Sequence, residues 1–378
     1  MKFIVDDKIP YIKGVLEPFG EVVYLSGEKI TPEVVIKADA LITRTRTICN
    51  EQLLSGSTVK FIATATIGFD HIDTEYCKTA GIKWVNAPGC NSGSVEQYIA
   101  SALFVMAKRN DFSLKNKTIG IIGAGHVGSK VARLCKNIGM NVLLNDPPLG
   151  RQDSSGTFCT LDDIMQQADI ITFHVPLNMK GNDQTYHLAD ESFFKRLNKQ
   201  PIIINSSRGE VIDTLAAKKA IQEKSVSTMV IDCWENEPQI DLDFLDMVSL
   251  ATPHIAGYSK DGKANGTTMS IQAISRFFSL GIDNWQPIMV DLPAKTIIEL
   301  DGLNLTDEEI LSRAVLATYD IRTDDETFRK NPDLFEKIRG DYPIRREYPV
   351  YKFVPKNIQP MTCDKLKLIG FNFCMNPD

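Results

Sequence analysis

The sequence predicts an α/β protein with two doubly wound parallel-sheet domains and a small C-terminal α+β domain. Short apolar runs alternate with helical patterns up to about residue 283, and this alternation is typical of parallel sheets with helices on both faces. A long helical stretch at residues 94–109 separates two series of such runs. Beyond the second series the alternation becomes irregular and the chain more charged, which favours a separate, smaller domain.

The first series contains five short apolar runs that we interpret as strands. They lie at residues 2–5, 22–24, 40–43, 60–63 and 83–85, and helical segments such as 32–37 and 71–79 separate them. We expect the first domain to comprise residues 1–93 together with about 257–286.

The second series predicts a second sheet within residues 94–256. Its strands are expected at residues 118–122, 141–145, 169–173, 202–205, 229–232 and 248–251, with helices between them. The long helix at 94–109 leads into this domain, and Ser94 is its predicted N-cap.

The C-terminal domain is expected to span residues 287–378. Proline-containing stretches at 285–287 and 291–293 form a predicted linker ahead of it. Strand-like runs at 295–300 and 350–354 and a helical run at 307–319 indicate a folded domain and not a tail.

Composition excludes several classes of protein. With 43% hydrophobic and 24% charged residues, the 378-residue chain has ordinary globular composition. A formal net charge of −6 argues against nucleic-acid binding. The eight cysteines form no C-x-x-C pair, so we expect reduced thiols, no zinc site and a cytoplasmic protein. No apolar stretch approaches the roughly 20 residues that span a bilayer, and the N-terminal apolar run is too short for a signal peptide.

A glycine-rich turn follows the predicted strand at 118–122 and opens a helical segment at 129–138. Its sequence, Gly123-Ala-Gly-His-Val-Gly128, fits the G-x-G-x-x-G pattern of Rossmann dinucleotide-binding domains. The first glycine permits the turn, Gly125 lets a pyrophosphate approach the backbone, and Gly128 lets helix and strand pack closely. Backbone N–H groups at the helix start, around His126 and Val127, are expected to bind the anion.

Asp146 is expected to bind the ribose of the same cofactor. It ends the strand at 141–145 and lies 18 residues beyond Gly128, close to the roughly 20 residues typical of a ribose-binding acid. A carboxylate there accepts from the ribose hydroxyls and repels a 2′-phosphate, so NAD is favoured over NADP. The alternative is a turn-forming role before Pro147, and Arg151 is the residue that could weaken the preference.

Three later segments place polar side chains beyond the ends of predicted strands. Arg208 follows the strand at 202–205, Glu237 follows the strand at 229–232, and His254 follows the strand at 248–251. The carboxyl ends of strands line the ligand crevice of open α/β sheets, so all three are expected on the side of the glycine turn. Each alone has a structural alternative, as an ion pair, a turn residue or a structural histidine.

In these stretches the sequence resembles the D-isomer-specific 2-hydroxyacid dehydrogenases. The matching residues are 123–128, 205–209, 232–238 and 252–257. The resemblance implies two Rossmann/flavodoxin-like domains, NAD as cofactor, and Arg208, Glu237 and His254 as the catalytic set. It also implies cofactor contacts by Ser206, Ser207, Arg208, Asp232 and Gly257, and by Val175, which replaces the usual threonine so that only its backbone can serve. No metal is expected.

The chemistry of 2-hydroxyacid oxidation explains these residue types. A hydride leaves C2 and a proton leaves the C2 hydroxyl, and histidine suits the base because its reference pKa of about 6.5 is near working pH. Glu237 would fix the tautomer of His254 and stabilise its imidazolium form. Arg208 would grip the substrate carboxylate with a permanently charged, planar fork.

The resemblance also places substrate contacts in the first domain. The loop around Thr66 is expected to bind the carboxylate, and Thr45 occupies a substrate-contact position where serine is usual. Arg44 and Arg46 flank Thr45 and are candidate substrate contacts, with solvated charges as the alternative. Tyr258, just after the catalytic histidine segment, is a further candidate.

The resemblance further implies a small phosphorylated 2-hydroxy acid as substrate, and its phosphate needs a cationic group. We expect Arg345 or Arg346 in the C-terminal domain to contribute, with Arg346 the predicted contact, and the resemblance implies that this domain forms a homodimer. The alternative for the arginine pair is neutralisation of acids such as Glu347. Two other functions stay open at this point: a dehydrogenase of the phosphoglycerate or glycerate type, and a non-catalytic NADH-sensing protein.

Overall fold

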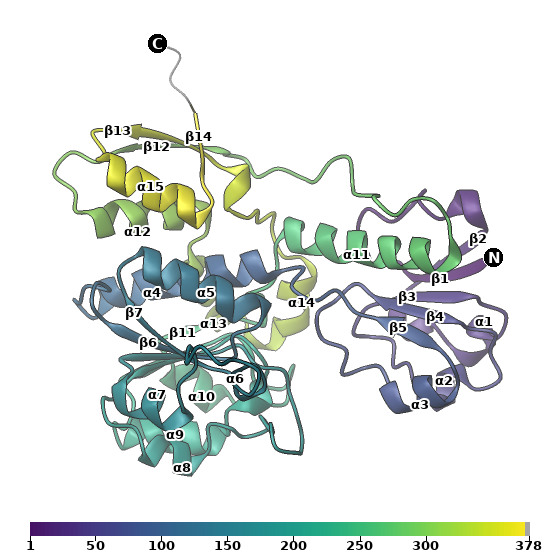
Figure 1. Ribbon diagram of the computed structural model, residues 1–378, viewed down its shortest axis with the longest axis horizontal. Coiled ribbons are helices and arrows are strands. Elements are labelled where there is room, and N and C mark those ends of the chain that lie inside the picture. The colour runs from purple at the N-terminus through teal and green to yellow at the C-terminus, as the bar shows by residue number, and fades with distance from the viewer. Residues whose placement is uncertain (375–378) are drawn as a thin grey trace. The chain divides into compact units, whose positions relative to one another are not determined.

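The computed structural model describes residues 1–374 and divides the chain into two compact units (Figure 1). The first unit consists of residues 1–91 and 259–291, and the second of residues 92–258 with the segment that starts at Leu292. The NAD-binding series and the C-terminal segment therefore belong to one unit. The three-domain division expected from the sequence stays a prediction.

The first unit is built on a five-stranded parallel sheet in the order β2-β1-β3-β4-β5. Helix α11 packs on one face, where Ile271 and Ile274 meet side chains of β1, β3 and β4, and the short helices α1 to α3 cover the other. The elements are β1 (Lys2–Asp6), β2 (Glu21–Leu25), α1 (Pro32–Val35), β3 (Ala40–Thr43), α2 (Glu51–Leu54), β4 (Phe61–Thr64), α3 (Thr74–Thr79), β5 (Lys83–Val85) and α11 (Lys260–Phe278).

A six-stranded parallel sheet in the order β11-β10-β9-β8-β6-β7 forms the centre of the second unit. Phe158 adds a single parallel bridge to Leu144 beyond β7, so a reduced seventh strand completes the order typical of Rossmann domains. The elements are α4 (Ser92–Arg109), β6 (Thr118–Ile122), α5 (His126–Asn137), β7 (Asn141–Asn145), α6 (Pro147–Gly150), α7 (Leu161–Gln167), β8 (Ile170–Phe173), α8 (Glu191–Lys195), β9 (Ile202–Asn205), α9 (Thr214–Gln222), β10 (Thr228–Ile231), α10 (Leu242–Met247) and β11 (Leu250–Ala251).

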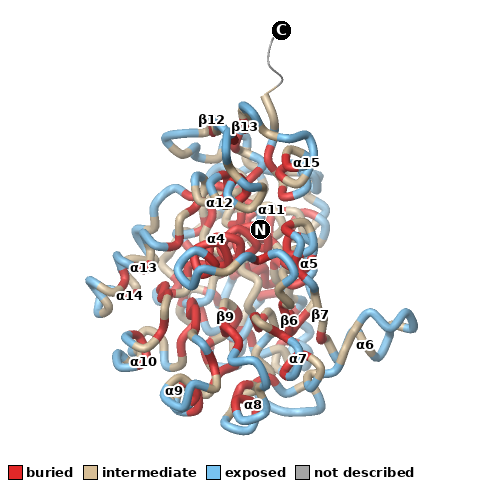
Figure 2. The backbone as a smooth tube through the Cα atoms, turned by 90° about the vertical axis from the view of Figure 1, so that its left-hand side faces the viewer, coloured by how far each residue is buried: buried red, intermediate tan, exposed pale blue. Residues whose placement is uncertain are grey.

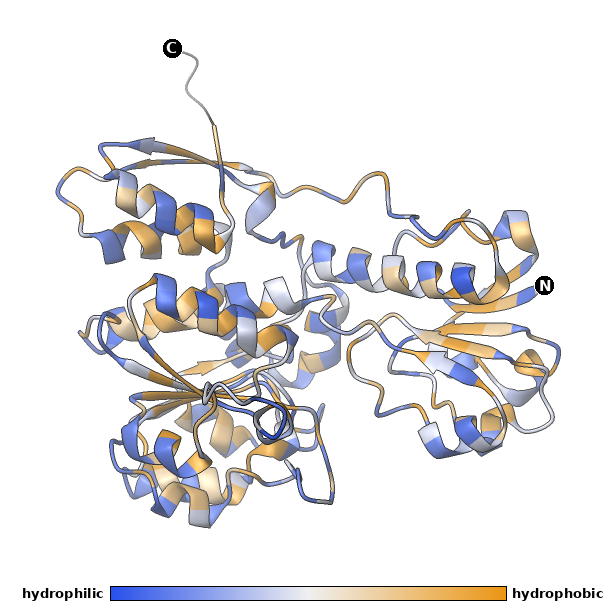
Figure 3. Ribbon diagram, in the orientation of Figure 1, coloured by the Kyte–Doolittle hydropathy of each residue, from blue (hydrophilic) through white to orange (hydrophobic). Residues whose placement is uncertain are grey.

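Hydrophobic residues concentrate in the strands of both larger sheets (Figure 3). Strands β3, β4, β8 and β9 are buried at every position. Continuous apolar strands of this kind are what a parallel sheet covered on both faces requires. The predicted fold class is confirmed.

The C-terminal segment forms a three-stranded parallel sheet in the order β12-β13-β14, with four helices. Its elements are β12 (Ile297–Asp301), α12 (Asp307–Thr318), α13 (Ile321–Lys330), α14 (Phe335–Gly340), β13 (Lys352–Lys356), α15 (Pro360–Ile369) and β14 (Asn372–Phe373). Asp325 of α13 accepts a hydrogen bond from the N–H of Ala251 in edge strand β11 at 2.8 Å. The helices of this segment pack on α4, α5 and β11 as well as on their own sheet, which accounts for the less regular pattern of its sequence.

Helix α4 lies between the six-stranded sheet and the C-terminal segment. Every residue from Ser92 to Ala107 is buried, and the helix appears as a continuous red segment in Figure 2. Its side chains share one hydrophobic core with α5, α12 and α15. Ser94 is not the N-cap, which corrects the prediction: the helix starts at Ser92, and Ser94 donates its hydroxyl to Glu347 at 2.8 Å.

The C-terminal arginine pair is buried in this unit. Arg345 is 4% exposed and Arg346 is 7% exposed. The guanidinium of Arg345 donates to Gln97 Oε1 at 2.8 Å and to the Ser94 carbonyl at 2.5 Å, and it lies 3.7 Å from the centre of the Tyr319 ring. These contacts favour a structural role for Arg345 over phosphate binding.

No helix within residues 1–374 is long and apolar enough to cross a membrane.

Glu96 of α4 is a buried acid whose ionisation should cost stability. Burial raises the pKa of Glu96 to about 7, against the attraction of Arg133 and Lys130. In the unfolded chain the same carboxyl titrates near 4.5, so the folded state binds the proton more tightly. Stability should therefore fall as pH rises from about 4.5 to about 7 and stay lower above that range.

Glu96→Gln removes this ionisation while preserving the shape of the side chain. We expect the free energy of unfolding to rise by about 1–3 kcal/mol at pH 8 and to change little near pH 4.5. Urea unfolding of the native protein and the variant at both pH values measures the difference. Exposed Glu326→Gln is the control, and a loss of stability at pH 8 in E96Q would contradict the prediction.

Candidate active site

The glycine turn after β6 is shaped for close backbone contact. Gly123 has a φ of 89°, and a Cβ there would lie 2.5 Å from the His174 carbonyl oxygen. A Cβ on Gly128 would lie 1.9 Å from the Gly123 carbonyl oxygen, so only glycine lets α5 approach the turn. A Cβ on Gly125 would meet nothing within 4 Å. Helix α5 begins with His126 and Val127, whose backbone N–H groups have no partner within the helix. The open space at Gly125 would let a pyrophosphate approach these N–H groups.

Asp146 stands at the end of β7 and ties the glycine turn to it. Its Oδ2 accepts from the Ala124 N–H at 2.9 Å, and its Oδ1 accepts from the Leu149 N–H at 3.0 Å. Each oxygen keeps a second lone pair for a ribose hydroxyl. Arg151 donates two hydrogen bonds to Asp183, at 2.9 and 2.6 Å. Because its guanidinium is engaged there, Arg151 is not placed to bind a 2′-phosphate and weaken the preference for NAD.

Asp146→Ala is expected to weaken NAD binding by about 10–100-fold, because a hydrogen bond to a charged acceptor is lost. The preference for NAD over NADP should narrow as the repelling carboxylate disappears. Fluorescence titration with NADH and NADPH measures both effects. Asp162→Ala, at an exposed acid on α7, is the control. Equal use of NAD and NADP by the native protein would refute this interpretation of Asp146.

Strand β8 ends beside the glycine turn. His174 is half-buried, with its Nε2 3.0 Å from the Thr172 hydroxyl, and desolvation lowers the pKa of His174 to about 3. The imidazole is therefore neutral near pH 7. Val175, the next residue, is half-buried, and its contact with the cofactor stays a prediction.

The loop after β9 is organised by Asn205, a residue that the motif alone did not single out. Its Oδ1 accepts from the N–H and hydroxyl of Ser207 at 3.1 and 2.8 Å, and its Nδ2 donates to the Arg208 carbonyl at 2.8 Å. The Ser206 hydroxyl is buried and has no hydrogen-bond partner within the described residues. Such an orphaned donor fits a site that a polar cofactor completes. Arg208 donates to the Ser207 carbonyl at 2.8 Å and is only partly buried.

Asp232 supports the catalytic loop from beneath. It is fully buried, and its carboxylate accepts from the Thr252 hydroxyl at 2.6 Å and from the Ile255 and Ala256 N–H groups at 2.8 and 2.9 Å. Burial raises the pKa of Asp232 despite these bonds. Its carboxylate thus holds the loop that carries His254. Direct contact with the cofactor, as the resemblance implies, stays a prediction.

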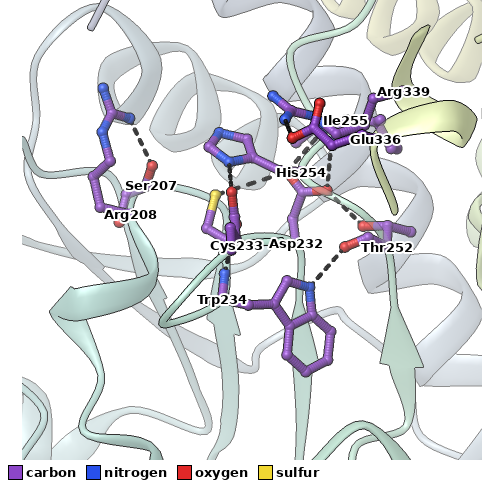
Figure 4. A network of polar contacts seen from close by, with 12 residues as sticks. Ser207, Arg208, Asp232, Cys233, Trp234, Thr252, His254, Ile255, Glu336 and Arg339 are labelled. Atoms are coloured by element: carbon purple, nitrogen blue, oxygen red, sulfur yellow. Dashed lines mark hydrogen bonds and ion pairs between the residues drawn. The ribbon is translucent and has the colours of Figure 1, made fainter. Parts of the chain in front are cut away.

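His254 and Glu237 form a hydrogen-bonded pair, with His254 Nδ1 2.7 Å from Glu237 Oε2 (Figure 4). The other oxygen of Glu237 accepts from the Trp234 N–H at 2.8 Å. Burial opposes ionisation of Glu237, but the charge of His254 and these hydrogen bonds outweigh it and hold the pKa of Glu237 below its usual value. Because Glu237 engages Nδ1, the other ring nitrogen of His254, Nε2, is the one that could accept a proton from a substrate.

The backbone of His254 is in the left-handed region, with a φ of 54°. Its N–H donates to the Asp232 carbonyl at 2.7 Å, and the two following N–H groups donate to the Asp232 carboxylate. A non-glycine residue adopts this conformation only where its surroundings impose it, and such residues concentrate at functional sites. His254 remains 32% exposed. In Figure 4, His254 and Arg208 both project beyond the strand ends of the six-stranded sheet.

Cys233 lies beside this pair. Ligand atoms of Cys233, Glu237 and His254 lie within 4.8 Å of one another, which is a donor set that zinc accepts. Burial raises the pKa of the Cys233 thiol well above its usual value, so a neutral thiol is favoured over a metal-ligating thiolate.

The predicted substrate residues of the first unit follow adjacent strands. Thr45 and Arg46, after β3, are exposed, whereas Arg44 forms an ion pair with the buried Asp6, at 3.3 Å between Nε and Oδ2. The hydroxyl of Thr66, after β4, lies 2.7 Å from the Thr64 hydroxyl and donates to the Gly68 carbonyl at 2.9 Å. Because β3 and β4 are parallel neighbours, both loops lie at one edge of the first sheet.

The remaining predicted residues lie in the second unit. Gly257 and Tyr258 end the loop of His254, and the Tyr258 ring packs edge-on against Tyr342 at 5.8 Å between centroids. The Arg346 carbonyl accepts from Gln97 at 3.1 Å. Arg339 of α14, which the sequence did not single out, lies 5.6 Å from the centre of the Tyr258 ring. No local pattern distinguishes Arg339 from its charged neighbours in α14, so only the tertiary structure could find it.

Comparison with known proteins identifies the family. The family model of the D-isomer specific 2-hydroxyacid dehydrogenase NAD-binding domain matches residues 94–256, and a domain of unknown function (DUF3410) matches residues 292–370. The chain is 52% identical over 355 residues to an erythronate-4-phosphate dehydrogenase of Bacteroides fragilis, covering 94% of this chain and 99% of that protein. It is 40% identical to the Proteus mirabilis protein of the same name, over 98% and 99% of the two chains.

The chain belongs to the erythronate-4-phosphate dehydrogenase family. This confirms the family resemblance that residues 123–128, 205–209, 232–238 and 252–257 indicate. It also confirms a D-2-hydroxyacid dehydrogenase with an NAD-binding domain. The assignment of individual residues stays a prediction.

A solved structure gives the same fold. The NAD⁺-bound 3-phosphoglycerate dehydrogenase of Entamoeba histolytica aligns with a TM-score of 0.64 and 25% identity, over 77% of this chain and 99% of that chain. About a quarter of this chain therefore has no counterpart in the phosphoglycerate enzyme.

Proposed function

We propose that this protein oxidises 4-phospho-D-erythronate at C2 to (R)-3-hydroxy-2-oxo-4-phosphooxybutanoate, with NAD⁺ as oxidant, in the biosynthesis of pyridoxal 5′-phosphate (vitamin B6). The observation that carries the proposal is the Glu237–His254 pair, at 2.7 Å, on the strand-end side that also bears Arg208 and the glycine turn. Its substrate is inferred from the relatives' shared name.

In this proposal each side chain has one chemical task. His254 takes the C2 hydroxyl proton on Nε2, while Glu237 holds Nδ1 and stabilises the imidazolium that forms. Arg208 binds the substrate carboxylate and polarises the C2 oxygen. Bound NAD⁺ supplies the hydride acceptor for C2. The residues that would hold NAD in this proposal are Gly123–Gly128, Asp146, Val175, Ser206, Ser207, Asp232 and Gly257.

The first unit contributes the remaining contacts in this proposal. The Thr66 loop binds the carboxylate through its N–H groups, and Thr45 donates a hydroxyl to the substrate. Arg44 and Arg46 add positive charge at the edge where β3 and β4 end. Arg44 is held by its ion pair with Asp6, and Arg46 is the more exposed of the two arginines.

The test is cofactor reduction with a panel of acids: 4-phospho-D-erythronate, D-erythronate, D-3-phosphoglycerate and D-glycerate. We expect the highest kcat/KM for 4-phospho-D-erythronate. Equal or better oxidation of D-3-phosphoglycerate would overturn the substrate assignment and leave a phosphoglycerate-type dehydrogenase. NADH binding without turnover of any acid would support an NADH-sensing protein instead.

We also propose a homodimer formed through the C-terminal segment. Several large apolar side chains are exposed there, including Ile297 (54%), Leu303 (64%), Met361 (69%) and Leu368 (58%). A second copy of the chain that covers them would bury this apolar surface. Light scattering should give twice the 42.2 kDa chain mass, whereas a monomer at micromolar concentration would refute the dimer.

Eight free cysteines, five of them buried, support a reducing, cytoplasmic location.

A further inference from the structure

Arg339 brings a positive charge from the C-terminal segment to the catalytic loop. It lies on α14, and its guanidinium carbon is 5.6 Å from the centre of the Tyr258 ring and 5.6 Å from the centre of the Phe335 ring. Figure 4 shows Arg339 and Glu336 next to the loop of His254 and Ile255. Nothing in the family motifs assigns a role to this arginine.

The guanidinium is only partly satisfied by the protein. Nη1 donates to Glu336 Oε1 at 3.1 Å, and the side chain is 20% exposed. Nε is buried and has no acceptor among residues 1–374. A buried N–H without an acceptor destabilises the folded protein, so its retention points to a ligand that completes the bonds of the guanidinium.

The acids around Arg339 keep it charged. Burial disfavours the cation, but Tyr258, Glu336, Glu237 and Asp232 together hold the pKa of Arg339 above its usual value. Glu336 is the acid in direct contact, and Glu237 is already engaged with His254. A permanent cation beside Tyr258, with donor capacity to spare, suits a phosphate ester better than a neutral group.

Arg345, one of the two C-terminal arginines expected to contact the phosphate, lacks this capacity. It is buried and donates to Gln97, Ser94 and Ile255, with the Tyr319 ring against its face. Moving Arg345 to a ligand would break these bonds inside the core, whereas Arg339 would exchange one contact with Glu336. Arg346, the other arginine expected there, is 7% exposed, against 20% for the Arg339 side chain. The phosphate contact is therefore better placed at Arg339 than at Arg345.

We propose that Arg339, with Tyr258 beside it, forms the subsite for the phosphate group of the substrate. This inference rests on the proposed oxidation of a phosphorylated 2-hydroxy acid. Arg339 donates to the phosphate oxygens, Tyr258 positions the guanidinium through its ring face, and Glu336 competes with the phosphate for Nη1. The alternative is that Arg339 only positions the Glu237–His254 pair through its charge.

Two substitutions with opposite expected effects test the subsite. Arg339→Met should raise KM for 4-phospho-D-erythronate by about 30-fold or more, because a buried charge-assisted contact is lost. It should change kcat/KM for D-erythronate by less than about threefold. Glu336→Gln should lower KM for the phosphorylated acid a few-fold, because it removes the competing carboxylate and a like charge. Arg322→Met, at an exposed arginine of α13, is the matched control.

The outcomes separate the two roles. An equal loss on both acids in R339M, or a shifted pH profile of kcat/KM with phosphate discrimination intact, would overturn the proposal in favour of a positioning role. An unchanged or raised KM for the phosphorylated acid in E336Q would also overturn it. These results hold even if R339M folds poorly, because E336Q keeps the arginine.

Direct binding distinguishes failure of the subsite from failure of the proposed function. Calorimetric titration of the NAD-loaded protein with inorganic phosphate needs no turnover. Binding that weakens at least tenfold in R339M, but not in R322M, supports the subsite even if no acid in the panel is oxidised. Equal phosphate binding by the native protein and R339M overturns it.

Discussion

Replacing His254 with alanine is expected to lower turnover by about 10²–10⁴-fold, the usual contribution of a positioned general base. The reason is structural: Glu237 fixes Nδ1 at 2.7 Å and a loop held by Asp232 fixes the backbone, so Nε2 is the group presented to substrate. NADH affinity should stay near that of the native protein, because the glycine turn and Asp146 are untouched. Steady-state kinetics with 4-phospho-D-erythronate and NADH titration measure the two quantities.

A second histidine–carboxylate pair provides the matched control for this prediction. His187 Nε2 lies 2.7 Å from Glu235 Oε1, and His187 also has a positive φ, of 49°. It resembles the catalytic pair in chemistry but has no proposed part in the reaction. His187→Ala should therefore change turnover by less than about tenfold. Comparable losses from both substitutions would mean that His254 acts through loop structure and not as the base.

The second large effect is expected on stability. Arg345→Met should lower the free energy of unfolding by about 3–5 kcal/mol, since breaking a buried charged network leaves its partners unpaired. Gln97 and two backbone carbonyls lose a donor, and the Tyr319 ring loses its cation. Urea or thermal unfolding measures the change, with exposed Arg322→Met as the control.

Kinetics of the folded fraction of R345M complete this test. If Arg345 is structural, KM for the phosphorylated acid should change little once the unfolded fraction is taken into account. Native-like stability with a large rise in that KM would restore Arg345 as a phosphate ligand and contradict its place in the core.

Local patterns were sufficient for the α/β architecture and for the chemistry-bearing residues of the second unit. Parallel strands that are buried on both faces appear in the sequence as short apolar runs. The glycine turn is visible in the sequence because it requires glycine at Gly123 and Gly128, within one six-residue stretch. Arg208, Glu237 and His254 each follow such a strand, so their common side of the sheet follows from the topology. Element ends were less predictable: Asp232 lies just beyond β10, where its buried carboxylate supports a loop 20 residues away.

Only the tertiary structure decided which charges are buried and where the C-terminal segment acts. Arg339, Arg345 and Arg346 are indistinguishable in sequence, since each is an arginine near other charged residues. Their roles depend on contacts with residues 80 to 250 positions away, such as Tyr258 for Arg339 and Gln97 for Arg345. Burial and pairing are properties of neighbours in space, and a local sequence pattern contains no information about neighbours so distant along the chain.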